Sequence, residues 1–284
     1  MILPDFILKS RMDQLWYESG IDTRISCLDK KHFDNYPYQI TYEYNSRGFR
    51  DVEWPDSNGL FNSIWCVGDS FTVGLGSPIG HTWPVLLKTA SKRNTINISM
   101  DGASNDWIAR KVLKILDVIS PKNIVIQWSF LPRVESDEIN LPDEERKKQY
   151  DAGDPSFKRA FNNFKKNFLS IETAKSKTNI IHSFIPNAIA LPDVTKIWDN
   201  IKGTEWPSQM PTNLNDLYSL QPFIISELVT VDQFENFEIY LEYYELLRNT
   251  TMIEYSQIDH ARDSFHYDIK TASKIVNEIL PLLE

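Results

Sequence analysis

The chain has 284 residues, of which 42% are hydrophobic and 24% charged, and its formal net charge is −9. This length and composition suit one large α/β domain, or such a domain with an extension. The acidic balance and the lack of a basic stripe argue against nucleic acid as a partner. No apolar run approaches the about 18 residues of a membrane span, and the start of the chain, broken by Pro4 and Asp5, lacks the pattern of a signal peptide. We therefore expect a cytoplasmic or virion-associated protein.

Residues 1–60 are aromatic, polar and irregular. Alternation over 38–44 predicts a strand, and the polar run 45–50 predicts a turn. We interpret 1–60 as an N-terminal extension that packs on a main domain formed by 61–284. Of the two cysteines, Cys27 lies in the extension and Cys66 inside an apolar run, where cysteine usually serves as a small hydrophobe. We expect two free thiols in a reducing compartment.

From residue 63 onward, apolar runs of strand length alternate with segments whose apolar residues recur at helical spacing. The expected strands are 63–67, 95–99, 123–128, 179–185 and 252–256. The expected helices are 81–91, 104–119 with Ser104 as its cap, 155–174, 233–248 and 267–283. Residues 186–230 are rich in Pro and Trp and are expected to form an insertion with structure of its own. This alternation predicts a three-layer α/β/α sandwich around a parallel, flavodoxin-like sheet.

Two short motifs flank the strand–helix alternation. Gly68-Asp69-Ser70 follows the first strand of the main domain, and Asp263-Ser264-Phe265-His266 precedes the last helix. In a parallel sheet the functional site lies at the carboxyl ends of the strands, so both motifs are expected at one edge. Serine, histidine and aspartate are the groups needed for nucleophilic acyl transfer, with Asp263 holding one imidazole nitrogen of His266 and the other taking the Ser70 proton. The alternative is structural: Ser70 and Asp263 as helix caps and His266 as a surface histidine.

No other pattern predicts a cofactor. The residues His81, His182 and His260 show no metal-ligand spacing, and no glycine-rich loop suited to phosphate is present. We expect neither a metal nor an organic cofactor.

The two motifs resemble the GDSL, or SGNH, hydrolase family. Residues 68–74 are similar to the family's first block, with Ser70 as nucleophile, and 263–266 are similar to its last block. Gly102, after the second strand, resembles the second block, and 45–50 resembles a segment often seen upstream of the first. The resemblance implies a cofactor-free serine ester hydrolase in which the backbone N–H groups of Ser70 and Gly102 hold the oxyanion.

One block departs from the family pattern. The third block has a Gly-x-Asn after the third strand, and that asparagine lines the oxyanion hole, whereas this chain has Ser129 and Phe130 there. We expect Asn105 to supply the missing side-chain donor, with Ser129 as the second choice and an ordinary first-turn helix residue as the alternative for Asn105. Arg133 follows the same strand and is expected to meet an anionic substrate or a carboxylate, or else to form a surface ion pair.

The resemblance implies a small-molecule or carbohydrate ester as substrate, which includes short acyl esters, lipids and O-acetyl groups on carbohydrate. Transfer of the acyl group to a sugar hydroxyl would use the same triad, and access of water to the acyl-enzyme decides between the two outcomes. A third hypothesis comes from another class of protein. The missing asparagine and the aromatic flanks favour a catalytically weak or inactive binding or structural module, for example a carbohydrate-recognising part of a virion, another multi-subunit assembly or a cell surface.

Overall fold

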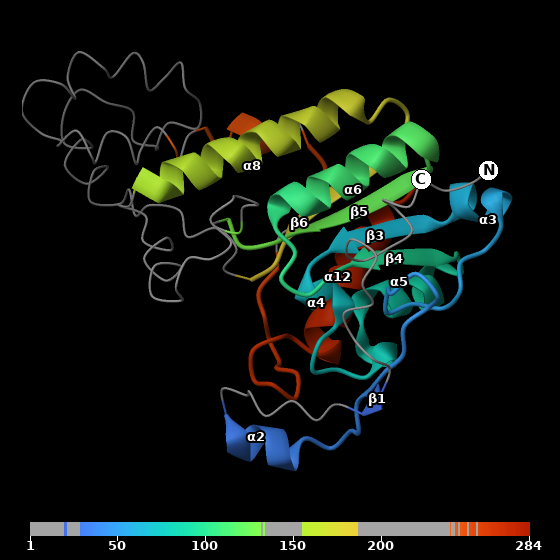
Figure 1. Cartoon of the computed structure of the whole chain (residues 1–284), viewed down its shortest axis with the longest axis vertical. Coiled ribbons are helices and arrows are strands. Elements are labelled where there is room, and N and C mark those ends of the chain that lie inside the picture. Colours follow the sequence, from blue (N-terminus) through green and yellow to red (C-terminus); the bar gives the residue numbers. More distant parts are fainter. Residues whose placement is uncertain are drawn as a thin grey trace, which may run out of the picture.

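The computed structural model describes residues 20–21, 29–131, 133, 155–186, 239, 242–243, 245–248, 250–253 and 255–284 (Figure 1). Cys27 and all but the first residue of the predicted insertion at 186–230 lie outside the described residues. The predicted helix over 233–248 is described only in part, and its described residues at 239, 242–243 and 245–247 are helical.

A five-stranded parallel sheet forms the centre of the fold, in the order β4-β3-β5-β6-β7. Its strands, in chain order, are β3 (Ile64–Gly68), β4 (Thr95–Ser99), β5 (Asn123–Trp128), β6 (Asn179–Phe184) and β7 (Met252–Ile253). The next strand along the chain, β4, lies on one side of β3, and the later strands β5, β6 and β7 lie on the other side. The strand order therefore reverses between β3 and β5. This is the flavodoxin-like order that the alternation predicts, and ligands of such sheets bind at that reversal.

Helices cover both faces of the sheet, which explains why β3, β4 and β5 are buried along their whole length. Along β3, Ile64 and Cys66 pack toward α5 (Trp83–Ser91) and α12 (Ile269–Ile279), while Trp65 and Val67 pack toward the other face. That other face is covered by α6 (Asn105–Val118) and α8 (Pro155–Ala174). Figure 1 shows these two helix pairs on opposite sides of the sheet. Cys66 is a free, buried thiol, as expected.

Most element boundaries agree with the sequence prediction. Ser104 Oγ accepts the backbone N–H of Trp107 at 3.1 Å and caps α6, as predicted. The terminal helix is shorter than the predicted 267–283, because it begins after Asp268 and gives way to a 3₁₀ turn, η2 (Leu280–Leu282), that contains a proline. The last strand is also shorter than the predicted 252–256, since β7 pairs with two residues of β6.

In the segment before β3, the described residues form short elements. These are β1 (Gly20–Ile21), α2 (Lys30–Asn35), β2 (Thr41–Tyr42) and α3 (Ser57–Asn62), and β1 and β2 form a small antiparallel pair. The strand predicted over 38–44 is thus reduced to two residues. After β3 come α4 (Ser70–Val73) and η1 (Ile79–His81). Within the described part of the chain, no helix is long and apolar enough to cross a membrane.

Candidate active site

Ser70 is the first residue of α4, directly after the carboxyl end of β3. Asp69 caps this short helix, because its Oδ1 accepts the backbone N–H of Phe71 at 3.0 Å. A Cβ at Gly68 would lie 2.1 Å from Thr72 Oγ1, so only glycine lets the helix turn back so closely over the strand. Ser70 is 2% exposed. The Gly-Asp-Ser sequence therefore builds a tight strand-to-helix turn with the serine at its tip.

Asp263 and His266 form a close pair in the loop before α12. His266 Nδ1 donates to Asp263 Oδ2 at 2.6 Å, while Asp263 Oδ1 accepts the backbone N–H groups of Phe265 and His266, each at 3.0 Å. Burial alone would raise the pKa of the Asp263 carboxyl, but the hydrogen bonds and charge of His266 and the two backbone N–H groups outweigh it, and this pKa lies below its usual value. The Asp263 carboxylate therefore holds the imidazole in place, and its hydrogen bonds to the backbone of Phe265 and His266 hold the carboxylate itself.

The loop places His266 beside the start of α4. The His266 ring lies 4.5 Å, centroid to centroid, from the ring of Phe71, the residue that follows Ser70. His266 Nε2 is buried and has no hydrogen-bond partner among the described residues. Ser70 and His266 therefore lie at the same sheet edge, but the structure contains no hydrogen bond between them. An unpaired buried ring nitrogen is costly, and such groups point to a functional role.

A network of buried polar side chains connects α4 with the loop that carries Asp263 and His266. Gln127 of β5 accepts from Thr72 Oγ1 at 2.8 Å and from Tyr267 OH at 3.1 Å, and it donates to Tyr255 OH at 2.6 Å. Thr72 belongs to α4 and Tyr267 follows His266, so one side chain links the two halves of the site. Sequence reasoning missed Gln127. The available signal was an amide near the carboxyl end of the strand, directly after the apolar run 124–126.

Two polar residues after β5 are directed at Asp69. Its Oδ2 accepts from Ser129 Oγ at 2.7 Å and from Arg133 Nη1 at 2.9 Å. Burial raises the pKa of the Asp69 carboxyl, and the Arg133 charge and the hydrogen bonds offset this only in part. Arg133 thus meets a carboxylate, one of the predicted possibilities, and that carboxylate is fully buried. The Ser129 hydroxyl donates to Asp69, so it is not the free oxyanion donor considered as second choice.

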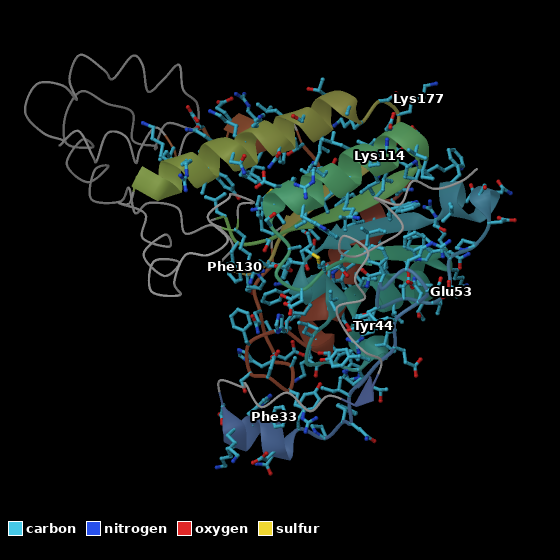
Figure 2. The ribbon with its side chains drawn as sticks, in the orientation of Figure 1. Phe33, Tyr44, Glu53, Lys114, Phe130 and Lys177 are labelled. Atoms are coloured by element: carbon cyan, nitrogen blue, oxygen red, sulfur yellow. The ribbon has the colours of Figure 1, made fainter. Side chains whose placement is uncertain are left out.

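Asn105 is engaged with the backbone of the loop after β5. Its Oδ1 accepts the N–H of Ser129 at 2.9 Å, and its Nδ2 lies 3.3 Å from the carbonyl oxygen of Ser129 and 3.2 Å from that of Phe130. These contacts hold the loop after β5, and the part predicted for Asn105 as a side-chain donor to the oxyanion stays a prediction. The side chain of Phe130, labelled in Figure 2, has no polar group to donate.

Two backbone donors remain at this edge. Gly102 follows β4 with a φ of +68°, and a Cβ there would meet nothing within 4 Å. The left-handed backbone favours glycine, and the space beside it is open. Neither the Ser70 N–H nor the Gly102 N–H donates a hydrogen bond within the described part of the chain. The candidate oxyanion donors are therefore backbone groups.

Among the residues that the structure describes, no group of three or more His, Cys, Asp or Glu side chains is arranged to hold a metal ion.

Comparison with known proteins finds solved structures whose fold is similar to that of this chain. No protein-family model and no curated protein matches the chain. Similar structures include TesA (13% identity, TM-score 0.42, 78% of this chain and 98% of that chain) and the lipase/acylhydrolase from Enterococcus faecalis (16%, 0.39, 78% and 97%). A GDSL-like lipase from Bacteroides thetaiotaomicron is also similar (13%, 0.36, 81% and 89%). The similar structures thus include members of the family that the motifs resemble, at an identity and TM-score from which no activity of this chain follows.

Proposed function

We propose that this chain is a serine ester hydrolase of the GDSL/SGNH type, with Ser70 as nucleophile, His266 as base and Asp263 as the residue that orients the base. One observation carries the proposal. His266 is fixed by a 2.6 Å bond to Asp263 on one ring nitrogen, while the other is buried, unpaired and beside the turn that presents Ser70. That is the arrangement that a base needs before it accepts the nucleophile's proton.

The proposed reaction uses these groups in two half-reactions. Ser70 Oγ attacks the ester carbonyl carbon, and its proton passes to His266 Nε2. The tetrahedral oxyanion accepts hydrogen bonds from the N–H groups of Ser70 and Gly102. When it collapses, His266 gives the proton to the departing alcohol and Ser70 is left acylated. Water then attacks the acyl-enzyme by the same route and releases the acid.

The substrate that we propose is a small-molecule or carbohydrate ester. If a sugar hydroxyl replaces water in the second half-reaction, the same residues catalyse acyl transfer. Product analysis with and without an added sugar acceptor separates the two: free acid indicates hydrolysis, and an acylated sugar indicates transfer.

The test of the proposal is covalent labelling. A fluorophosphonate probe should label the wild-type protein, and mass spectrometry should place the adduct on Ser70. Ser70→Ala should lose both the label and the turnover of p-nitrophenyl acetate, while Ser170→Ala, which removes an exposed hydroxyl on α8, should keep both. Folded wild-type protein that takes up no label would contradict the proposal.

A second candidate is a non-catalytic module on the same fold. The observation that favours it is that the described residues offer no free side-chain donor to the oxyanion: the Phe130 side chain cannot donate, and the Asn105 amide is engaged with the loop after β5. One such donor contributes roughly 100- to 1,000-fold in rate. Folded protein without label or turnover, but with binding to a carbohydrate array, would support this candidate.

A further inference from the structure

Arg50, which precedes the first strand of the sheet, is buried beneath the turn that follows α4. It is 2% exposed, and its Nη1 donates to the carbonyl oxygens of Val73 at 3.2 Å and Gly74 at 2.5 Å. Its Nη2 donates to the carbonyls of Ser77 at 2.8 Å and Thr41 at 3.2 Å. A planar guanidinium with a fork of N–H donors can hold several carbonyls at once, which a lysine ammonium does with much less geometric control. One side chain thus fixes both ends of residues 74–77, which we call the 74–77 turn.

Tyr42 of β2 fixes the middle of the same turn. Its hydroxyl accepts the backbone N–H of Gly76 at 2.9 Å, and its ring lies 4.5 Å from the Arg50 guanidinium carbon. The 74–77 turn is therefore held at both ends and in the middle by side chains from the segment before β3.

The 74–77 turn is in direct contact with the loop of Asp263. Arg262 N donates to the carbonyl of Gly76 at 2.9 Å. A Cβ added to Gly76 would lie 3.0 Å from both the carboxyl carbon and Oδ2 of Asp263, and Gly76 has a φ of +77°. The 74–77 turn and the Asp263 carboxylate are thus packed so closely that no further atom fits between them. A displacement of the turn would therefore displace the Asp263–His266 pair relative to Ser70.

Helix α2 contacts the other side of this loop. His32 Nε2 donates to the carbonyl of Ala261 at 2.9 Å, and the Arg262 guanidinium lies 3.9 Å from the centre of the Phe33 ring. Figure 1 shows α2 beside the loop that leads to α12, and Figure 2 labels Phe33 there. The Asp263 loop is held between α2 and the 74–77 turn, and both supports depend on residues 29–50.

We propose that residues 29–50 form part of the catalytic machinery, with Arg50 as a positioning residue that sets the Asp263–His266 pair against Ser70 through the 74–77 turn. This inference rests on the proposed hydrolase function. Arg50 contacts none of the reacting groups in the structure, so its effect on the reaction acts through the geometry of the pair. Because misplacement of reacting groups by about 1 Å costs roughly 100-fold in rate, even a small shift of the turn has a measurable effect.

The experiment compares Arg50→Lys with wild-type protein and with Ile171→Val, a core change in α8 on the opposite face of the sheet. Arg50→Lys should lower kcat for p-nitrophenyl acetate, and the rate of fluorophosphonate labelling at Ser70, by about 10- to 100-fold, with KM nearly unchanged. Ile171→Val should leave both rates near wild type. Tyr42→Phe, which removes the acceptor for Gly76 N–H, should lower kcat in the same direction and gives a second test if Arg50→Lys does not fold.

A spectroscopic readout separates this inference from the proposed function. The proton on His266 Nδ1, bonded to Asp263, should give a far-downfield proton NMR signal in the wild type and Ile171→Val, and a shifted or exchange-broadened one in Arg50→Lys. Unchanged rates and an unchanged signal in folded Arg50→Lys would overturn the positioning role alone. Wild-type protein without labelling would overturn the proposed function, and the NMR signal would still show whether Arg50 sets the pair.

Discussion

Replacing Asp263 by asparagine tests the centre of the proposed site with a minimal change in shape. The asparagine keeps an Oδ1 that can accept the N–H groups of Phe265 and His266, so the turn should persist. Its Nδ2, however, carries hydrogens and would face His266 Nδ1, which in the wild type donates across 2.6 Å. The imidazole would then place its proton on Nε2, which can no longer accept one from Ser70.

The expected loss is large because the pair is poorly screened by solvent. The side chains of His266 and Asp263 are only 9% and 13% exposed. Loss of the correct tautomer in a Ser-His-Asp triad lowers kcat by about 10⁴-fold, which corresponds to roughly 5 kcal/mol of transition-state stabilisation. Stability should change much less, since one charge-assisted hydrogen bond contributes about 1.5–3 kcal/mol.

The pH dependence of stability has a definite sign. The folded-state pKa of Asp263 lies below its usual value, so the carboxylate stabilises the fold above the unfolded-state pKa of about 3.9 and loses this contribution as pH falls through the folded-state pKa. Asp263→Asn should therefore be less stable than wild type at pH 7, and the difference should shrink on acidification below about pH 4.

The assay is turnover of p-nitrophenyl acetate at pH 7 together with thermal unfolding. Glu172→Gln is the matched control, because Glu172 forms a second buried carboxylate–histidine contact, 3.1 Å from His182 Nε2, away from the site. The control should keep wild-type turnover. A folded Asp263→Asn that retains turnover within about threefold of wild type would refute the triad, since the wrong tautomer costs about 10⁴-fold.

Four further results are expected. Turnover should fall as pH drops through about 6 to 7, because the base must be neutral imidazole, and a rate that stays flat to pH 4 would exclude His266 as base. Lys111→Met should raise the melting temperature more at pH 6 than at pH 10, because burial lowers the pKa of Lys111 to about 7 and its charged form destabilises the fold below that pH; an equal effect at both pH values would contradict this. Asn105→Ala should lower the free energy of unfolding by about 1–3 kcal/mol, because the buried N–H of Ser129 loses its partner, and urea unfolding measures this loss. With a net charge of −9, the protein should not shift DNA or RNA in a gel at physiological salt, and salt-sensitive micromolar binding would overturn that expectation.

Local patterns were sufficient for most of the sheet and its helices. The strands over 95–99 and 123–128 and the helix over 155–174 have the predicted boundaries. Each boundary lies where the local pattern of apolar residues changes. The short edge strand β7 was overestimated, since its length depends on how far its single neighbour extends. Strand order was predictable because the hand and reach of the connections leave few alternatives.

The sequence by itself determined the local geometry of the two turns that form the candidate site. Gly68-Asp69-Ser70 and Asp263-x-x-His266 each form a local turn whose residues bond within three positions of one another, so spacing alone specifies them. Tertiary structure decided everything that joins segments far apart in the chain. It bonded Asn105 to the loop after β5 and Ser129 to Asp69, linked Gln127 to Thr72 of α4 and placed Arg50 under the 74–77 turn. The physical reason is that a polar side chain takes whichever donors and acceptors the packed fold brings within about 3 Å, and those partners are not encoded in the spacing around it.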